Sequence, residues 1–203
     1  MNPLNNHKHS LILGIVLAIV IALVLAATLG GGIRFTPPAF ARWLHIVSGV
    51  FWIGLLYYFN AVQVPALAEA AADKGGPGGA GITKYVAPRA LWWFRWGAVF
   101  TWIFGAWLLG PRTPAAFTFG LATGGTDQST IVIGIGAWLG TIMLLNVWGL
   151  IWPNQKKILG LKPATDEEKA KARKVALYAS RTNFVLSIPM LMCMGSSFHG
   201  LPI

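Results

Sequence analysis

The chain has 203 residues, of which 55% are hydrophobic and only 11% are charged. A soluble domain carries about a quarter charged residues, so this composition excludes an ordinary soluble domain and predicts a protein embedded in a lipid bilayer. The net charge is +10, but the basic residues lie in loops and at the ends of apolar segments. That placement is typical of membrane orientation and excludes nucleic acid as the expected partner.

Five apolar segments follow one another, each long enough to cross a bilayer as an α-helix. The first is longer than the core of a secretory signal and has no clean cleavage site, so we expect it to be retained as a span. Pro65 and Pro153 are expected to end the second and fourth segments. Pro88 is expected to start the third segment, and Pro189 to bend the fifth.

Backbone groups in hydrocarbon must be bonded within their own segment, which favours helices over any other structure. The sequence therefore predicts an all-α integral membrane bundle of about five transmembrane helices in a single domain. Gly136 and Gly140 form a GxxxG pair that predicts close helix packing, and Cys193 is expected to be a small packed residue. The predicted spans are residues 11–29, 40–64, 88–109, 131–152 and 175–197.

Orientation follows from the basic residues of each loop. The loop between the fourth and fifth segments is strongly basic, whereas the loops on the other side carry only Arg34 and Arg112. The N-terminus is therefore expected inside and the C-terminus outside. In a bacterium this means a multi-pass protein of the inner (cytoplasmic) membrane with its C-terminus in the periplasm. The basic residues of that loop are Lys156, Lys157, Lys162, Lys169, Lys171, Arg173 and Lys174.

Two of the four histidines fall within or at the end of a span. His7 and His9 belong to the polar N-terminal tail, but His45 lies about two turns inside the second segment and His199 lies at the end of the fifth. The predicted orientation places both in the outer leaflet. Two imidazoles from antiparallel helices can ligate one haem iron. The alternative is a pair of interface histidines bonded to backbone or water.

The residues around these histidines suit a haem. Gly49 lies one turn beyond His45 on the same helical face and would leave room for a porphyrin. Gly195 lies one turn before His199, and Arg42 could pair with a propionate. The predicted haem b site, with the two histidines as iron ligands, comprises His45, His199, Gly49, Trp52, Arg42 and Gly195.

A second set of polar residues falls in the opposite, inner leaflet. One interpretation is a substrate pocket for an anionic or amide-rich molecule. A second is a structural hydrogen-bond network between helices, and a third, for the arginines, is snorkelling to the interface. These residues are Asn60, Arg95, Asn146, Arg181 and Asn183.

Four stretches occur in order that together resemble one family. They are RWLHIVSGVFWIG, WWFRWGAVFTWIFGAWLL, GAWLGTIMLLNVWGLIWPNQKKIL and SRTNFVLSIPMLMCMGSSFHGLP. The chain resembles the membrane domain of the bacterial cytochrome-c-linked urate oxidase, also called urate hydroxylase, in a short form without the C-terminal cytochrome c domain. The first stretch also resembles the haem-binding helix of copper-resistance and protoporphyrinogen-oxidase proteins.

The resemblance implies a periplasm-facing redox membrane protein. Members of the family are thought to hydroxylate urate with water and to pass the electrons to cytochrome c, and His45 and His199 align with histidines of the family motifs. Other positions depart from the pattern. Trp92, Gly134 and Arg181 stand where longer members have histidine, and Gly97 stands where they have glutamate.

Three hypotheses of function remain open. The first is a haem-b-type electron-transfer subunit that relays electrons from a membrane partner to a separate periplasmic cytochrome c. The second is a urate hydroxylase that uses a cytochrome c on another chain. The third is a cofactor-free accessory subunit of a larger respiratory or photosynthetic membrane complex.

Overall fold

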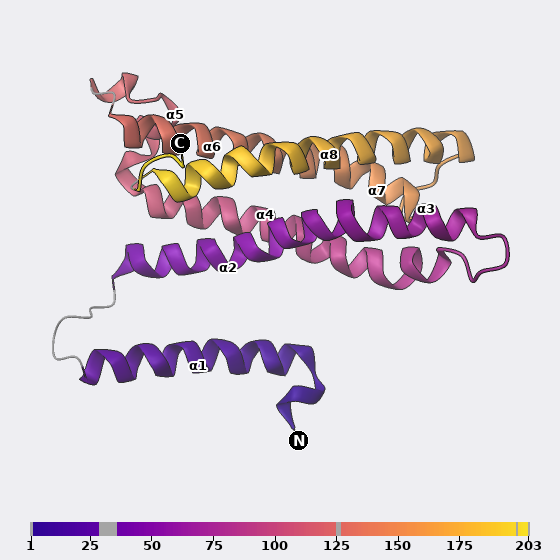
Figure 1. Cartoon of the computed structure of the whole chain (residues 1–203), viewed down its shortest axis with the longest axis horizontal. Coiled ribbons are helices and arrows are strands. Elements are labelled where there is room, and N and C mark those ends of the chain that lie inside the picture. Colours follow the sequence, from indigo (N-terminus) through magenta and orange to yellow (C-terminus); the bar gives the residue numbers. More distant parts are fainter. Residues whose placement is uncertain (1, 29–35, 125–126, 198, 203) are drawn as a thin grey trace. The chain divides into compact units, whose positions relative to one another are not determined.

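The computed structural model describes residues 2–28, 36–124, 127–197 and 199–202, and Figure 1 shows its helices. All regular structure in these residues is helical. Two compact units can be distinguished, Met1–Phe40 and Ala41–Ile203. The main helices are α1 (His7–Thr28), α2 (Pro37–Tyr58), α3 (Val64–Ala72), α4 (Ala87–Leu109), α5 (Thr113–Phe117), α6 (Gln128–Asn146), α7 (Trp152–Ile158) and α8 (Asp166–Ser196). Shorter turns of helix cover Pro3–Asn5, Phe59–Gln63, Ile82–Val86, Gly110–Arg112, Leu121–Thr123 and Val147–Ile151.

Three helical segments in the described part of the chain are long and apolar enough to cross a membrane: His7–Thr28, Pro37–Ala72 and Gln128–Ile158. The all-helical prediction is thus confirmed, and the chain has the features of a membrane protein. The helices α4 and α8 are also long, but α4 contains Arg89 and Arg95 and the first turns of α8 are strongly charged. The count of five spans and the orientation stay predictions.

The prediction that Pro65 and Pro153 end their helices is wrong. Both helices continue, to Ala72 and Ile158, because a wider π-turn precedes each proline. In each case the residue just before the proline donates its N–H to the carbonyl five residues back: Val64 to Phe59, and Trp152 to Val147.

The π-turn relieves the usual conflict at a proline. A proline ring clashes with the carbonyl four residues earlier and offers it no N–H. Shifting the preceding bond to five residues opens the backbone at that carbonyl, so the helix passes through. Pro88 lies in the first turn of α4, as predicted, and the π-turn Ile82–Val86 leads directly into that helix, with the Ala87 N–H bonded to the Ile82 carbonyl. The helix α8 likewise continues through Pro189.

The helices α2, α4, α6 and α8 pack lengthwise in the second unit (Figure 1). Their shared core contains Trp52 and Leu56 of α2, Phe94 of α4 and Met143 of α6, all at most 2% exposed. Tight packing of α6 on α8 depends on a glycine, because a Cβ at Gly136 would lie 3.1 Å from the Cβ of the buried Cys193. The expected packing roles of Gly136 and Cys193 are confirmed, but the expected role of Gly140 is not, because a Cβ at that position meets no atom within 4 Å.

Polar contacts on one face of α8 fix its position against α2 and α6. The amide of Asn183 is fully buried, donates to the Met143 carbonyl at 3.0 Å and accepts from the amide of Asn146 at 3.0 Å. In the contact with α2, the amide of Asn60 donates to the Ser180 hydroxyl of α8 at 2.9 Å. Such interhelical bonds contribute about 0.6 kcal/mol each in membrane proteins.

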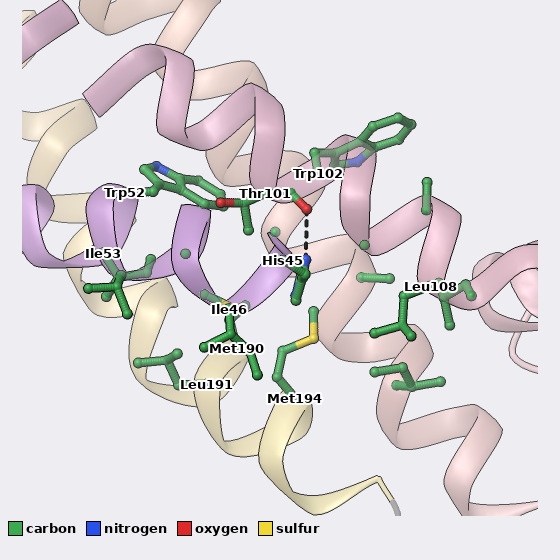
Figure 2. A pocket seen from close by; sticks show the side chains of 18 of the residues that line it. His45, Ile46, Trp52, Ile53, Thr101, Trp102, Leu108, Met190, Leu191 and Met194 are labelled. Atoms are coloured by element: carbon green, nitrogen blue, oxygen red, sulfur yellow. Dashed lines mark hydrogen bonds between the residues drawn. The ribbon is translucent and has the colours of Figure 1, made fainter. Parts of the chain in front are cut away.

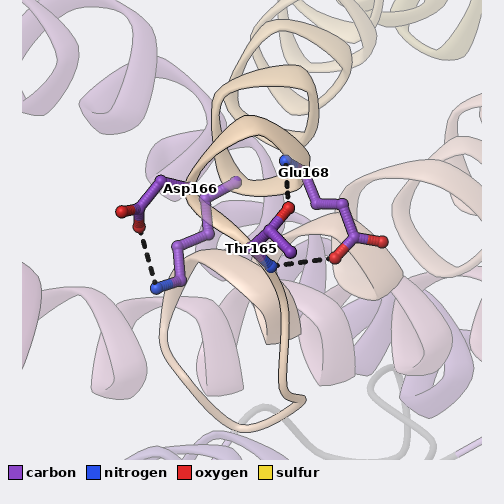
Figure 3. Close-up of polar contacts among 4 residues, drawn as sticks. Thr165, Asp166 and Glu168 are labelled. Carbon is purple, nitrogen blue, oxygen red and sulfur yellow. Dashed lines mark hydrogen bonds and ion pairs between the residues drawn. The ribbon is translucent and has the colours of Figure 1, made fainter.

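The first turn of α8 is closed by a capping box, shown in Figure 3. The Thr165 hydroxyl accepts from the Glu168 amide at 3.2 Å, and the Thr165 amide donates to the Glu168 carboxylate at 2.9 Å. Lys157 on α7 lies 3.8 Å from the same carboxylate. The bond from the Thr165 amide, followed by the charge of Lys157, lowers the pKa of Glu168 below its ordinary value.

We expect this cap to weaken at acidic pH. Because the folded-state pKa of Glu168 is lowered, its stabilising effect is complete above the ordinary glutamate value of about 4.3. This stabilisation is lost as the pH falls through the lowered folded-state pKa of Glu168. A carboxyl-carbon NMR titration of Glu168 should give a midpoint below about 4.3, and Lys157→Gln, which removes the facing charge and leaves the Thr165 amide in place, should raise it. A midpoint that Lys157→Gln leaves unchanged would contradict the contribution of the Lys157 charge to the shift.

Candidate functional site

A pocket of about 500 Å³ lies between α2, α4, α6 and α8 (Figure 2). This volume falls in the range of about 300–1,000 Å³ that is usual for ligand sites. Nearly all of its wall is apolar, and among the described residues that line it His45 is the only one with an ionisable side chain. Apolar wall residues include Ile46, Ile53, Trp102, Leu108, Met190 and Met194.

The half-buried imidazole of His45 is anchored across the bundle. Its Nδ1 lies 2.7 Å from the carbonyl oxygen of Thr101 on α4. A carbonyl can only accept, so Nδ1 carries the proton and donates. In a neutral imidazole the other ring nitrogen, Nε2, is then an acceptor with a free lone pair. Figure 2 shows the bond on the α4 side of the ring, with the remainder of the ring toward the pocket.

Glycines on α4 make this contact with α2 sterically feasible. A Cβ at Gly105 would lie 2.9 Å from Cε1 and 3.0 Å from Nδ1 of His45, so any larger residue would displace the ring. Farther along the same pair of helices, a Cβ at Gly97 would lie 3.2 Å from the backbone nitrogen of Trp52. The spacing Gly97–Thr101–Gly105 therefore forms a stripe of small residues that lets α2 approach α4 closely.

Other glycines leave open space in the pocket. Gly54 and Gly140 line it, and a Cβ built on either meets no atom within 4 Å. Trp52 is also a wall residue, and its buried Nε1–H has no hydrogen-bond partner among the described residues. The pocket thus offers space for an apolar planar group and one nitrogen lone pair.

Only part of the predicted haem site lies in this pocket. His45, Gly49 and Trp52 line it, as the shared helical face predicts. The other three predicted residues are exposed and are not among the described residues of the wall: Arg42, Gly195 and His199. The backbone explains the position of His199, because α8 ends at Ser196 and His199 lies in the turn that follows.

The five polar residues predicted for the inner leaflet do not line this pocket either. Three of them, Asn60, Asn146 and Asn183, make the interhelical bonds described above. Arg95 stacks over the ring of Trp152, 3.8 Å from its centroid, and Arg181 is exposed. This geometry matches a structural network for the three asparagines.

The sequence interpretation missed Thr101, Gly105 and the two methionines of the pocket. Gly97, Thr101 and Gly105 recur every four residues, which is the signal of a close-packed helical face. Met190 and Met194 are also four residues apart and so share one face of α8. Neither pattern identifies which helix lies opposite, so the pocket could not be assembled from spacing alone.

The comparisons with known proteins give one match. Residues 116–202 match the family model described as urate oxidase N-terminal. The matched range covers Ala116 and Phe117 at the end of α5, all of α6 and α7, and all of α8. It includes His199 but not His45. No curated protein and no solved structure matches the chain.

We expect Gly105→Ala to break the His45 anchor. The added methyl would occupy the space of the imidazole and force Nδ1 away from the Thr101 carbonyl. Nitrogen-15 NMR of histidine-labelled protein in detergent should show His45 as the Nδ1–H tautomer in the parent and a changed tautomer or charge state in the variant. Gly149→Ala is the matched control, because its Cβ meets no atom within 4 Å. An unchanged His45 spectrum in Gly105→Ala would contradict the prediction.

Proposed function

Because residues 116–202 form a domain related to the urate oxidase N-terminal family, we propose that the chain is a haem-b-binding electron-transfer subunit of a urate-oxidase-related system. It would lie in the bacterial inner membrane and pass electrons from a membrane partner to a periplasmic cytochrome c. The observation that carries the proposal is the His45 imidazole, which is fixed through Nδ1 and faces an apolar pocket with a free Nε2.

A histidine that ligates haem iron through one ring nitrogen needs a hydrogen bond from its other ring nitrogen. A ligating histidine almost always donates its other ring N–H to a carbonyl or carboxylate, which fixes the tautomer and makes the ligating nitrogen more basic. The Thr101 carbonyl supplies that acceptor at 2.7 Å. Thr101 is itself held in place, since its hydroxyl donates to the Gly97 carbonyl at 2.7 Å.

The pocket suits a porphyrin better than a small polar substrate. Its apolar wall can cover a macrocycle, and the open space at Gly54 and Gly140 leaves room for the ring. Urate is polar and anionic, and burying it among apolar side chains without hydrogen-bond partners would cost several kcal/mol. The chemistry of the wall therefore favours the cofactor.

Each part of the pocket has a distinct role in this proposal. Bound haem would supply one-electron exchange between ferric and ferrous iron. His45 would hold the iron, Thr101 would orient His45, and the apolar wall would exclude water and so tune the redox potential. With the C-terminus outside, His45 falls in the outer leaflet, within reach of a soluble electron acceptor in the periplasm.

We expect the purified protein, loaded with haemin in detergent, to give a b-type reduced-minus-oxidised spectrum. His45→Leu should abolish that spectrum because it removes the nitrogen ligand and leaves an apolar side chain. His9→Ala, in the N-terminal tail, is the control and should retain it. A folded parent protein without a b-type band would refute the proposal. Its co-purification with a larger membrane complex would then favour a cofactor-free accessory subunit.

A second candidate, urate hydroxylation, is favoured by the family match alone. Its pocket would involve the inner-leaflet residues Asn60, Arg95, Asn146, Arg181 and Asn183. The test is urate-dependent reduction of added cytochrome c by the purified protein. Turnover by the parent protein that is lost in Arg181→Gln, a substitution of an exposed side chain, would support it. Absence of turnover would leave the electron-relay proposal as the stronger one.

A further inference from the structure

We infer that Met194, and not His199, would hold the haem iron together with His45. The inference rests on the haem site proposed above and names a residue that the histidine pattern did not suggest. Its basis is that Met194 lines the same pocket as His45, from the opposite helix. In Figure 2 the Met194 side chain extends from α8 toward His45.

Hydrogen bonds between α2 and α8 bring Met194 to the level of His45. The two helices run antiparallel, and they are held in register by Asn60 with Ser180 at 2.9 Å and by Tyr57 with Ser187 at 3.1 Å. Each turn toward the start of α2 is matched by a turn toward the end of α8. Continued along both helices, this register places His45 near the last turn of α8, which contains Met194.

His199 lies near the same level but is not in the pocket. The helix has ended before it, and its side chain is exposed. Its backbone amide bonds back to the Ser196 carbonyl at 3.3 Å, which keeps it in a turn outside the helical face that carries Met190 and Met194. To reach the pocket, this turn would have to be remodelled, whereas Met194 is already there.

Of the two methionines in the wall, Met194 is the better placed. Met190 is 5% exposed and belongs to the closely packed core cluster. Met194 is only partly buried and packs at the margin of that cluster. The absence of a side chain at Gly136 leaves room for the methyl group of Met194, since a Cβ at Gly136 would lie 3.3 Å from Met194 Cε. Three rotatable bonds let a methionine side chain adjust the position of its sulfur toward a group bound in the pocket.

A thioether suits this environment chemically. It is a neutral, soft ligand that needs no proton removed and no hydrogen-bond partner in an apolar wall. Histidine and methionine together raise the potential of a haem iron. The inferred ligand pair would therefore make this site a better electron acceptor than the pair of histidines that the sequence suggests.

The test uses the full chain loaded with haemin in detergent, with near-infrared magnetic circular dichroism and a potentiometric titration as readouts. The parent should show a methionine-to-ferric-iron charge-transfer band. Met194→Leu should keep the haem through His45 but lose that band and its low-spin state. Met194→His should keep a low-spin haem and lower its midpoint potential. Met192→Leu, an exposed methionine of the same helix, is the matched control and should match the parent.

The outcomes separate this inference from the haem proposal itself. A low-spin haem that survives Met194→Leu unchanged, or that is lost in His199→Ala, would overturn the assignment of Met194 while leaving the haem proposal intact. Loss of the charge-transfer band or a change in midpoint potential in Met190→Leu, with neither in Met194→Leu, would also overturn the assignment of Met194. A folded parent protein that binds no haem would overturn both the assignment of Met194 and the haem proposal.

Discussion

The hydrogen bond between His45 Nδ1 and the Thr101 carbonyl determines what this bundle can bind. A polar ring inside an apolar bundle needs a partner, since an unpaired polar group there is costly. Pairing with a carbonyl commits Nδ1 as the donor and so leaves Nε2 as an acceptor at the pocket. The bond exists only because α4 has a glycine at 105, where any side chain would meet the imidazole. The chemistry of the pocket thus follows from a missing side chain on the neighbouring helix.

The prolines show how backbone geometry extends the helices beyond the span lengths expected from sequence. Each of Pro65, Pro88 and Pro153 follows a π-turn in which the preceding residue bonds five residues back. The wider turns change the helical phase, so residues after them face a different direction from the one a uniform 3.6-residue period gives. Asn60 lies in such a turn and reaches α8 through it. These turns therefore help to set the α2–α8 register on which the level of His45 depends.

Much of the fold could be predicted from the sequence, because apolar length and helical periodicity are local properties. The helices, the shared face of His45, Gly49 and Trp52, and the packing role of Gly136 follow from spacing, and the packing of Cys193 follows from the apolar run around it. The site could be predicted only in part. Gly105 and Met194 lie on helices remote in sequence from His45, and spacing within a helix does not reveal its neighbour. The exposure of His199 depends on where α8 ends, and helix ends are the least predictable feature of a sequence.

The departures from the urate oxidase pattern have a structural counterpart. At position 134 a side chain would collide with the Ala116 carbonyl of α5, and at position 97 it would meet the backbone of Trp52 on α2. A histidine or glutamate at these places would push α5 off α6 and α2 off α4. Separation of α2 from α4 would also break the bond between His45 and Thr101, two turns along the same contact. In this packing, a glutamate at 97 and the anchored imidazole of His45 exclude each other.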